Sequence, residues 1–137
     1  AGAALASGML AIADGSDLGG SLRNPANFNN IVALRPSVGL VPSAPAALPL
    51  TNMAVNGPMA RSVADPAFLL SVMAGADPRD PACYASEPAR FAAPLDRDLR
   101  GVRVAWSPDL GELPLDRRVL AVLVAQRRTF ETLGLAA

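Results

Sequence analysis

A short glycine-rich segment carries the residues of this chain that are best suited to chemistry. It runs Asp14-Gly-Ser-Asp-Leu-Gly-Gly-Ser and directly follows an apolar stretch. Glycines allow successive backbone N–H groups to face one point, and this arrangement stabilises an oxyanion. The last residue, Ser21, is therefore a candidate nucleophile. The candidate oxyanion donors are the backbone N–H groups of Leu18, Gly19, Gly20 and Ser21.

Two other interpretations of this segment stay open on the residues alone. The first is a tight glycine turn that has only a structural role. The second is a phosphate-binding glycine loop, but such a loop uses a lysine, and the chain has none. Pro25 also argues against a phosphate loop, because a proline there is expected to break the helix that should follow.

The composition excludes several classes of function. The 137 residues include no histidine and no lysine, so they hold neither a Ser-His-Asp triad nor a histidine-ligated metal site. Twelve arginines balance 12 acidic residues, so no basic field is present to bind nucleic acid or an anionic membrane surface. We therefore expect a small neutral partner, no nucleic acid, no membrane, no metal and no cofactor.

Two further features bear on the location of the protein. No apolar run reaches the roughly 18 residues of a membrane span, and residues 1–13 lack a basic leader, so neither an anchor nor a signal peptide is predicted. Cys83 is the single cysteine and cannot form an internal disulfide. Both features agree with a cytoplasmic protein.

The first part of the chain is predicted to position the glycine-rich segment at the end of a strand. Gly8 is expected to end a first helix of small residues, and Pro25 to limit a second helix to about one turn. Five prolines between 35 and 58 predict a loop and exclude a long helix or a central strand. The predicted elements are a helix over 1–7, a buried strand over 9–13, a turn over 14–17, a short helix over 21–26 and a strand over 31–34.

The second part of the chain is predicted to add two longer helices and one strand. Ser62 and Asp65 form a capping pair before a helix over 63–74, which Gly75 ends. The apolar face of this helix is predicted to consist of Val63, Phe68, Leu69, Val72 and Met73. After a loop over 77–94, alternation predicts a strand over 100–106, and a helix capped by Asp116 ends at Gly134. Alternating helices and strands indicate an α/β fold.

The glycine-rich segment and its surroundings resemble the amidase signature enzymes. The resemblance runs through Gly15-Ser-Asp-Leu-Gly-Gly-Ser-Leu-Arg-Asn-Pro-Ala26 and continues in Leu34-Arg-Pro-Ser37 and Gly57-Pro-Met-Ala-Arg-Ser-Val-Ala-Asp65. It extends more loosely over 77–81 and 99–106. The resemblance implies a layered α/β/α structure with a mixed β-sheet core, of which residues 1–137 form an incomplete portion.

The resemblance also implies hydrolysis of amide bonds by a Ser-cisSer-Lys triad. A lysine acts as general base, a serine with a cis peptide bond relays the proton, and a second serine, matched here by Ser21, forms the acyl-enzyme. The lysine and the relay serine would lie before Ala1. We therefore expect residues 1–137 to be a partial amidase signature domain that lacks this upstream segment and the C-terminal remainder. Amidase activity is expected of the full-length parent, whereas the isolated chain is expected to be inactive and to self-associate.

Three further residues of the segment match supporting positions of the family. Asp17 and Arg23 are expected to brace the loop as an ion pair, and Ser16 to hydrogen-bond the lysine and the relay serine. The chain departs from the usual family pattern at Ala33, where glycine is common, and at Leu40, where arginine is common. These departures bear on local packing and on the rim of the substrate site, not on the class of reaction.

Two alternatives to a general amidase remain at this stage. The A-type component of an amidotransferase shares the signature, but the proline- and alanine-rich residues 41–49 differ from what is expected after its corresponding turn. A non-catalytic fragment or ligand-binding remnant is the other alternative, because a serine without its general base loses a rate factor of about 10² to 10⁴. For the parent protein we favour hydrolysis of a small-molecule amide.

Overall fold

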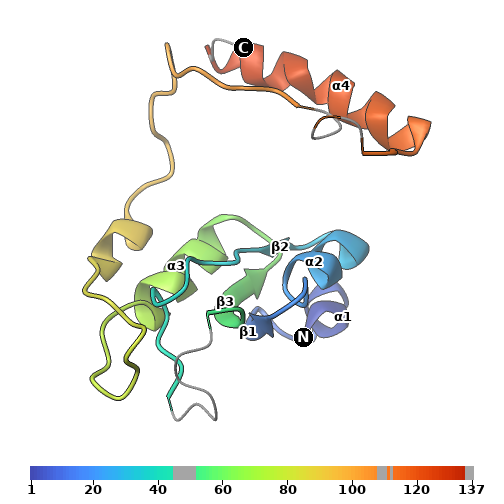
Figure 1. Cartoon of the computed structure of the whole chain (residues 1–137). Coiled ribbons are helices and arrows are strands. Elements are labelled where there is room, and N and C mark those ends of the chain that lie inside the picture. Colours follow the sequence, from blue (N-terminus) through green and yellow to red (C-terminus); the bar gives the residue numbers. More distant parts are fainter. Residues whose placement is uncertain (45–51, 108–110, 112, 135–137) are drawn as a thin grey trace. The chain divides into compact units, whose positions relative to one another are not determined.

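The computed structural model describes residues 1–44, 52–107, 111 and 113–134. The chain divides into two compact units, residues 1–95 and 96–137. The elements of the first unit are α1 (Gly2–Ala6), β1 (Ile12–Asp17), α2 (Arg23–Asn29), β2 (Val32–Ala33), β3 (Val55–Ala60), α3 (Ala64–Met73) and the 3-10 helix η1 (Pro88–Ala92) (Figure 1). The second unit contains α4 (Arg117–Thr132).

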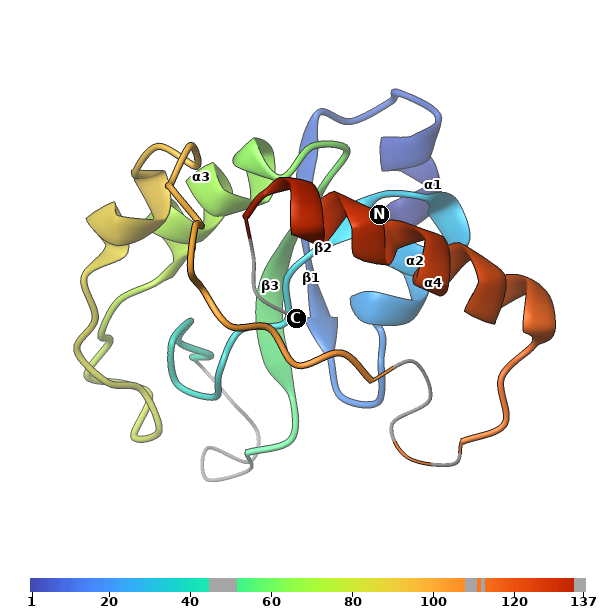
Figure 2. The same ribbon diagram turned by 90° about the horizontal axis from the view of Figure 1, so that it is seen from above.

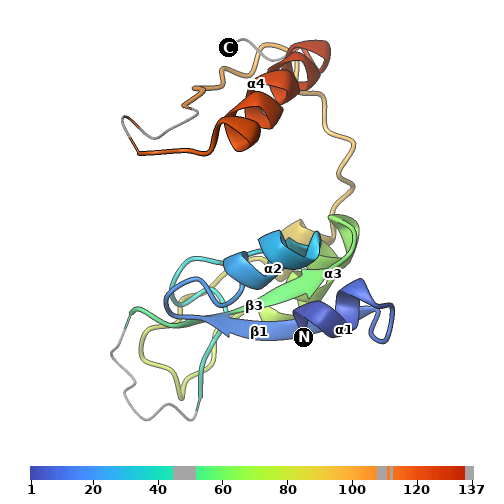
Figure 3. The ribbon, with the colours of Figure 1, turned by 90° about the vertical axis from the view of Figure 1, so that its right-hand side faces the viewer.

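The strands of the first unit form an antiparallel sheet in which β3 is the central strand. β1 and β3 run side by side, from Ile12 opposite Ala60 to Asp17 opposite Val55 (Figure 3). α1 and α2 lie together on one side of the strands and α3 on the other (Figures 1 and 2). The loop that follows Asp17 therefore begins at the end of a paired strand.

Proline does not keep the segment before Ala60 out of the centre of the sheet, and the prediction that it would is wrong. Pro58 is a buried residue of β3. Its carbonyl accepts a hydrogen bond from the N–H of Leu34 at 3.1 Å, one residue past the end of β2. Because the N and C=O of a strand residue point to the same side, the missing N–H of Pro58 faces Leu34, beyond the last residue of β2, and does not interrupt the pairing with β1. Residues 45–51 of the predicted loop lie outside the described residues.

β1 begins later and ends later than predicted. Met9 and Leu10, which were expected in a buried strand, precede β1 and are exposed. The polar residues 14–17, predicted as a turn, instead form the second half of the strand, because they pair with β3. The turn follows at 18–22, so the prediction that Ser21 lies just beyond the end of a strand is confirmed.

α2 is longer than the single turn predicted from Pro25. This proline occupies the first turn of the helix, where backbone N–H groups have no intrahelical acceptor, so its missing donor costs nothing there. The helix ends at Asn30, which has a left-handed conformation with φ of 50°. Pro25 therefore does not argue against a phosphate-binding loop. The absence of a lysine is the remaining argument against it.

The core beneath the glycine-rich loop is a small cluster of Leu5, Leu22 and Met59. Leu22 directly follows Ser21 and is fully buried. It reaches the central strand because Gly57 has no side chain, and a Cβ there would lie 2.8 Å from Cδ1 of Leu22. Packing of Leu22 thus fastens the residue next to the candidate nucleophile to the sheet.

The predicted Ser62–Asp65 pair is present before α3, but Val63 is the N-cap residue of the helix, and the helix buries a different face than predicted. Ser62 Oγ accepts a hydrogen bond from the backbone N–H of Asp65 at 3.2 Å, and the two side chains are also hydrogen-bonded at 2.7 Å. The buried residues of the helix are Pro66 and Leu70, and Leu70 packs with Leu40 and Ala74 in a second apolar cluster. The predicted face was wrong, because three of its members are exposed: Val63, Phe68 and Val72. Apolar side chains lie almost all round this helix, so spacing cannot select the buried stripe.

The second unit consists of α4 and an extended segment that runs along it (Figure 1). Asp116 caps α4 as predicted, because its carboxylate accepts the N–H of Arg118 at 2.8 Å. The strand predicted over 100–106 is wrong, since the structure has only an isolated bridge at Arg103. Trp106 instead packs edge-on against Phe130 of α4, with ring centroids 5.3 Å apart. Packing of Trp106 against this helix shows that one side of an alternating segment can be partly buried without joining a sheet.

The described residues lack both a membrane-spanning helix and a cluster of metal-ligating side chains. None of their helices combines the length and the apolar character needed to cross a membrane. They also contain no cluster of three side chains able to ligate a metal ion.

The buried stripe of α3 leads to a stability prediction. We expect Leu70→Ala to lower the free energy of unfolding by about 2 to 5 kcal/mol, because it leaves a cavity in the cluster with Leu40 and Ala74. Val72→Ala, on the exposed side of the same helix, should change it by less than about 0.5 kcal/mol. Urea unfolding followed by circular dichroism measures both. Equal losses at the two positions would contradict the observed orientation of α3.

Candidate active site

Ser21 lies in an exposed turn between β1 and α2, held between two buried residues. On one side is Gly20, whose φ of +121° is one that residues with a side chain rarely adopt. On the other side is Leu22 in the core. The side chains of Ser21 and Ser16 are exposed, and neither has a hydrogen-bond partner among the described residues. The turn therefore presents the Ser21 hydroxyl to the surface while its two neighbours stay fixed.

The carboxylate of Asp17 is the centre around which this turn is built. Its side chain is fully buried at the end of β1. The backbone N–H of Gly20 donates to Oδ1 at 2.7 Å, and those of Leu22 and Arg23 donate to Oδ2 at 3.3 and 3.4 Å. The Arg23 guanidinium adds a bidentate pair, with Nε 2.9 Å from Oδ2 and Nη2 3.0 Å from Oδ1. The expected ion pair between Asp17 and Arg23 is thus present.

These contacts divide the four predicted oxyanion donors. The N–H of Gly20 points inward and is bonded to Asp17. The N–H groups of Leu18, Gly19 and Ser21 have no acceptor among the described residues. The loop therefore collects N–H groups on an anion, but the anion it holds here is a carboxylate of the protein itself.

The electrostatics of this centre favour the charged form of Asp17. Its pKa lies far below the ordinary value, chiefly because Arg23 bonds the carboxylate. Burial acts in the opposite direction, and the N–H groups of Gly20, Leu22 and Arg23 outweigh it together with the guanidinium. The same contact raises the pKa of Arg23. The carboxylate therefore stays charged near neutral pH. Its role is to order the loop through hydrogen bonds, and it does not exchange protons in this pH range.

A second arginine, Arg35, also faces this carboxylate and was not identified from the sequence. Its Nε lies 3.6 Å from Oδ1 of Asp17, and its Nη2 donates to the carbonyl of Met53 at 3.0 Å. Arg35 belongs to the Leu34-Arg-Pro-Ser37 stretch that resembled the family, but spacing gave no sign that this stretch returns to Asp17. Only the antiparallel pairing of β2 and β3 brings it there.

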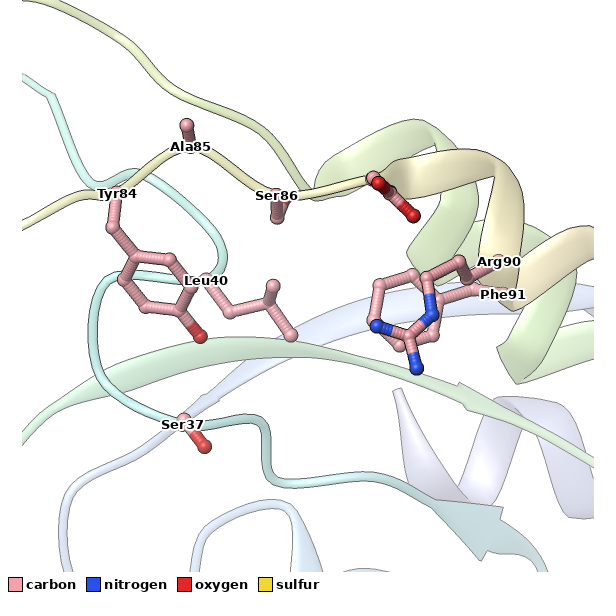
Figure 4. Close-up of a pocket in the computed structure, with 8 residues that line it drawn as sticks. Ser37, Leu40, Tyr84, Ala85, Ser86, Arg90 and Phe91 are labelled. Carbon is pink, nitrogen blue, oxygen red and sulfur yellow. The ribbon is translucent and has the colours of Figure 1, made fainter.

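A separate hollow of about 690 Å³ lies between the loop after β2 and the residues that lead into η1. Leu40 lies between the rings of Tyr84 and Phe91, and the hydroxyl-bearing Ser37 and the guanidinium of Arg90 also face this space (Figure 4). None of its described lining residues belongs to the segment from Ser16 to Arg23. The available sequence signal was weak: Tyr84 and Phe91 are two of the six aromatic residues of the chain and lie seven positions apart.

Comparison with known proteins places these features in a family. A family model described as Amidase matches residues 1–137. The chain belongs to the amidase signature family. A crystal structure of a bacterial aryl acylamidase of this family matches it with a TM-score of 0.87 and 33% identity, covering 99% of this chain and 28% of that one. The predicted α/β fold of the amidase signature type is thereby confirmed, and the antiparallel sheet of the first unit is part of it.

Two relatives in sequence show which kinds of amidase signature protein share this segment. An acylamidase of Rhodococcus erythropolis is 40% identical over 134 residues, which cover 98% of this chain and 28% of that protein. The A component of the glutamyl-tRNA(Gln) amidotransferase of Synechococcus sp. (strain WH7803) is 38% identical over 133 residues, which cover 96% of this chain and 27% of that protein. The chain therefore spans little more than a quarter of the length of these relatives.

The pKa of Asp17 leads to a prediction about pH. A carboxyl whose pKa is lowered by folding stabilises the fold fully above its unfolded pKa, about 4, and this contribution is lost as the pH falls through the folded value. We therefore expect Asp17→Asn to lower the urea midpoint clearly at pH 7 and progressively less below pH of about 4. Urea midpoints of the variant and the original protein at pH 7 and pH 3 measure this difference.

A matched control for this experiment is Asp98→Asn. Asp98 pairs with Arg100 at 2.8 Å, but both side chains are mostly exposed, so little change in midpoint is expected at either pH. A loss for Asp17→Asn that is the same at both pH values would contradict a stabilising charge at Asp17.

Proposed function

We propose that the full-length protein hydrolyses the amide bond of a small molecule through an acyl-enzyme on Ser21. The observation that carries the proposal is the geometry of the turn. The buried Asp17, paired with the partly exposed Arg23, and the buried Leu22 hold an exposed serine beside N–H groups that have no acceptor among the described residues. Membership of the amidase signature family supports this reading over a purely structural glycine turn.

The proposed reaction uses these positions as follows. The Oγ of Ser21 attacks the amide carbonyl, and its proton passes through the relay serine to the lysine. The oxyanion that forms accepts hydrogen bonds from the N–H groups of Leu18, Gly19 and Ser21, while Gly20 shapes the turn through its contact with Asp17. Collapse expels the amine, which takes up the proton, and water then releases the acid and restores Ser21. Ser16, exposed on β1, is proposed to hydrogen-bond the lysine and the relay serine.

The proposal requires groups that residues 1–137 do not contain. The chain has no lysine, so the general base and its relay serine are proposed to come from a segment before Ala1. Residues 1–137 are then a partial amidase signature domain and are inactive by themselves, because loss of the general base costs a rate factor of about 10² to 10⁴. Self-association of the isolated chain belongs to the same proposal, since large apolar side chains such as Phe28 and Met9 are exposed.

Water is the proposed acceptor of the acyl group. The acylamidase relative favours hydrolysis of a small amide, whereas the similar identity to the amidotransferase component keeps an A-type amidotransferase component as the second candidate. Residues 41–49, whose composition differs from that expected of such a component, favour the first. A cytoplasmic location, suggested by the single cysteine, is part of the same proposal.

Labelling with a fluorophosphonate probe tests the nucleophile. We expect the full-length protein to react at Ser21, and Ser21→Ala to abolish both the labelling and at least about 10⁴-fold of the amide hydrolysis. Residues 1–137 alone should remain unlabelled, because their serine lacks its base. Ser43→Ala, which removes another exposed serine, is the matched control and should leave labelling intact. Hydrolysis that survives Ser21→Ala would refute the assignment.

The shape of the turn leads to a second prediction. A Cβ on Gly20 would lie 2.6 Å from Nδ2 of Asn24 on a backbone that disfavours side chains, so Gly20→Ala must displace the loop. We expect this change to slow labelling about 10² to 10³-fold, the loss typical of a misplaced oxyanion donor. The neighbouring Gly19 has open space around its Cβ position, so Gly19→Ala should slow labelling much less. Equal effects of the two variants would show that the backbone conformation at Gly20 is not what matters.

A further inference from the structure

The side chain of Arg35 lies away from β2, the strand that precedes it. It follows β2 by two residues, and its side chain turns back to the end of β1, where Nε lies 3.6 Å from Oδ1 of Asp17. This Nε is buried and has no hydrogen-bond partner among the described residues. A buried guanidinium nitrogen without a hydrogen bond is costly, and its ion pair with the Asp17 carboxylate supplies the compensating interaction.

The two contacts of Arg35 lie on two neighbouring strand ends. Asp17, the last residue of β1, stands opposite Val55, the first residue of β3. Met53, whose carbonyl accepts the N–H of Arg35 at 3.0 Å, comes two residues before Val55. The guanidinium of Arg35 therefore spans the open end of the β1–β3 pair, directly where the Ser21 turn leaves the sheet.

Arg23 and Arg35 hold Asp17 in different ways. Arg23 begins α2 and lies within the same turn, and more than half of its side chain is exposed. The side chain of Arg35 is 29% exposed. Among the described residues that contact the carboxylate, the others belong to the segment 17–23, whereas Arg35 comes from outside it. Arg23 thus closes the turn on itself, whereas Arg35 fixes the turn relative to the sheet.

We propose that Arg35 is a positioning residue for the Ser21 nucleophile. This inference rests on the proposed function of Ser21. Arg35 acts through Asp17. Arg35 sets the orientation of the carboxylate, the carboxylate sets the direction of the Gly20, Leu22 and Arg23 N–H groups, and these set the place of Ser21 between them. Misplacement of a nucleophile by about 1 Å lowers the rate of its reaction by roughly 10²-fold, even when the protein stays folded.

The test measures the reaction of Ser21 with a fluorophosphonate probe in the full-length protein. Labelling time courses at increasing probe concentration give the maximal labelling rate and the concentration for half of that rate. The variants are Arg35→Met, which removes the charge at similar length, and Arg35→Lys, which keeps the charge but loses the fork. Arg79→Met is the matched control, because Arg79 forms an ion pair of 2.6 Å with Asp77 and is largely exposed. Circular dichroism and thermal unfolding report the folded fraction of each variant.

We expect Arg35→Met to lower the maximal labelling rate by about 10- to 100-fold while the half-maximal concentration changes less than about threefold. Arg35→Lys should fall between Arg35→Met and the original protein, and Arg79→Met should equal the original. A rate for Arg35→Met within about twofold of the original overturns the proposal, as does a loss that only follows the folded fraction. Labelling that persists in Ser21→Ala, or is absent from the original protein, would instead refute Ser21 as the nucleophile.

Discussion

Burial of the Asp17 carboxylate is the constraint on which the geometry of the Ser21 turn depends. An unpaired carboxylate at this depth would cost many kcal/mol, so the chain must surround it with donors. It does so with three backbone N–H groups and the bidentate Arg23. Aiming the N–H of Gly20 inward requires the positive φ of that residue. The exposed position of Ser21 accompanies this inward arrangement of the residues beside it.

Apolar packing gives this polar centre a rigid support. Leu22 is fully buried between α1 and the central strand, and its burial stabilises the fold by about 1.5 to 3 kcal/mol. Gly57 of β3 leaves the space into which Leu22 fits. The turn is thus fixed by the Asp17–Arg23 ion pair, which joins its two ends, and by the buried Leu22 next to Ser21. A serine held in this way keeps its position without side-chain hydrogen bonds of its own among the described residues, which is the preorganisation that the proposed function requires.

The shared segment helps to explain why relatives of different activity resemble this chain to a similar degree. An acylamidase and the A component of an amidotransferase are 40% and 38% identical to it over nearly the same length. The proposed function gives the shared segment one step, in which Ser21 attacks an amide carbonyl and an oxyanion is stabilised. Under this proposal, the residues that perform the step lie in the turn after β1.

Local sequence was sufficient for several features because their causes are local. Gly8, Ser62 with Asp65, Asp116 and Gly134 act on the helix ends beside them, and the expected ion pair joins residues only six apart. The signature residues likewise identified the family and located the candidate nucleophile after a strand.

Features that depend on distant partners were not predictable in this way. Pro58 is tolerated in the central strand because β2 has ended beside it, and α3 buries Leu70 instead of Val72 because Leu40 lies against it. Trp106 packs against Phe130 of α4, and Arg35 meets Asp17, because long-range pairing and packing bring these segments together. Periodicity and spacing carry no information about which distant surface a segment will meet.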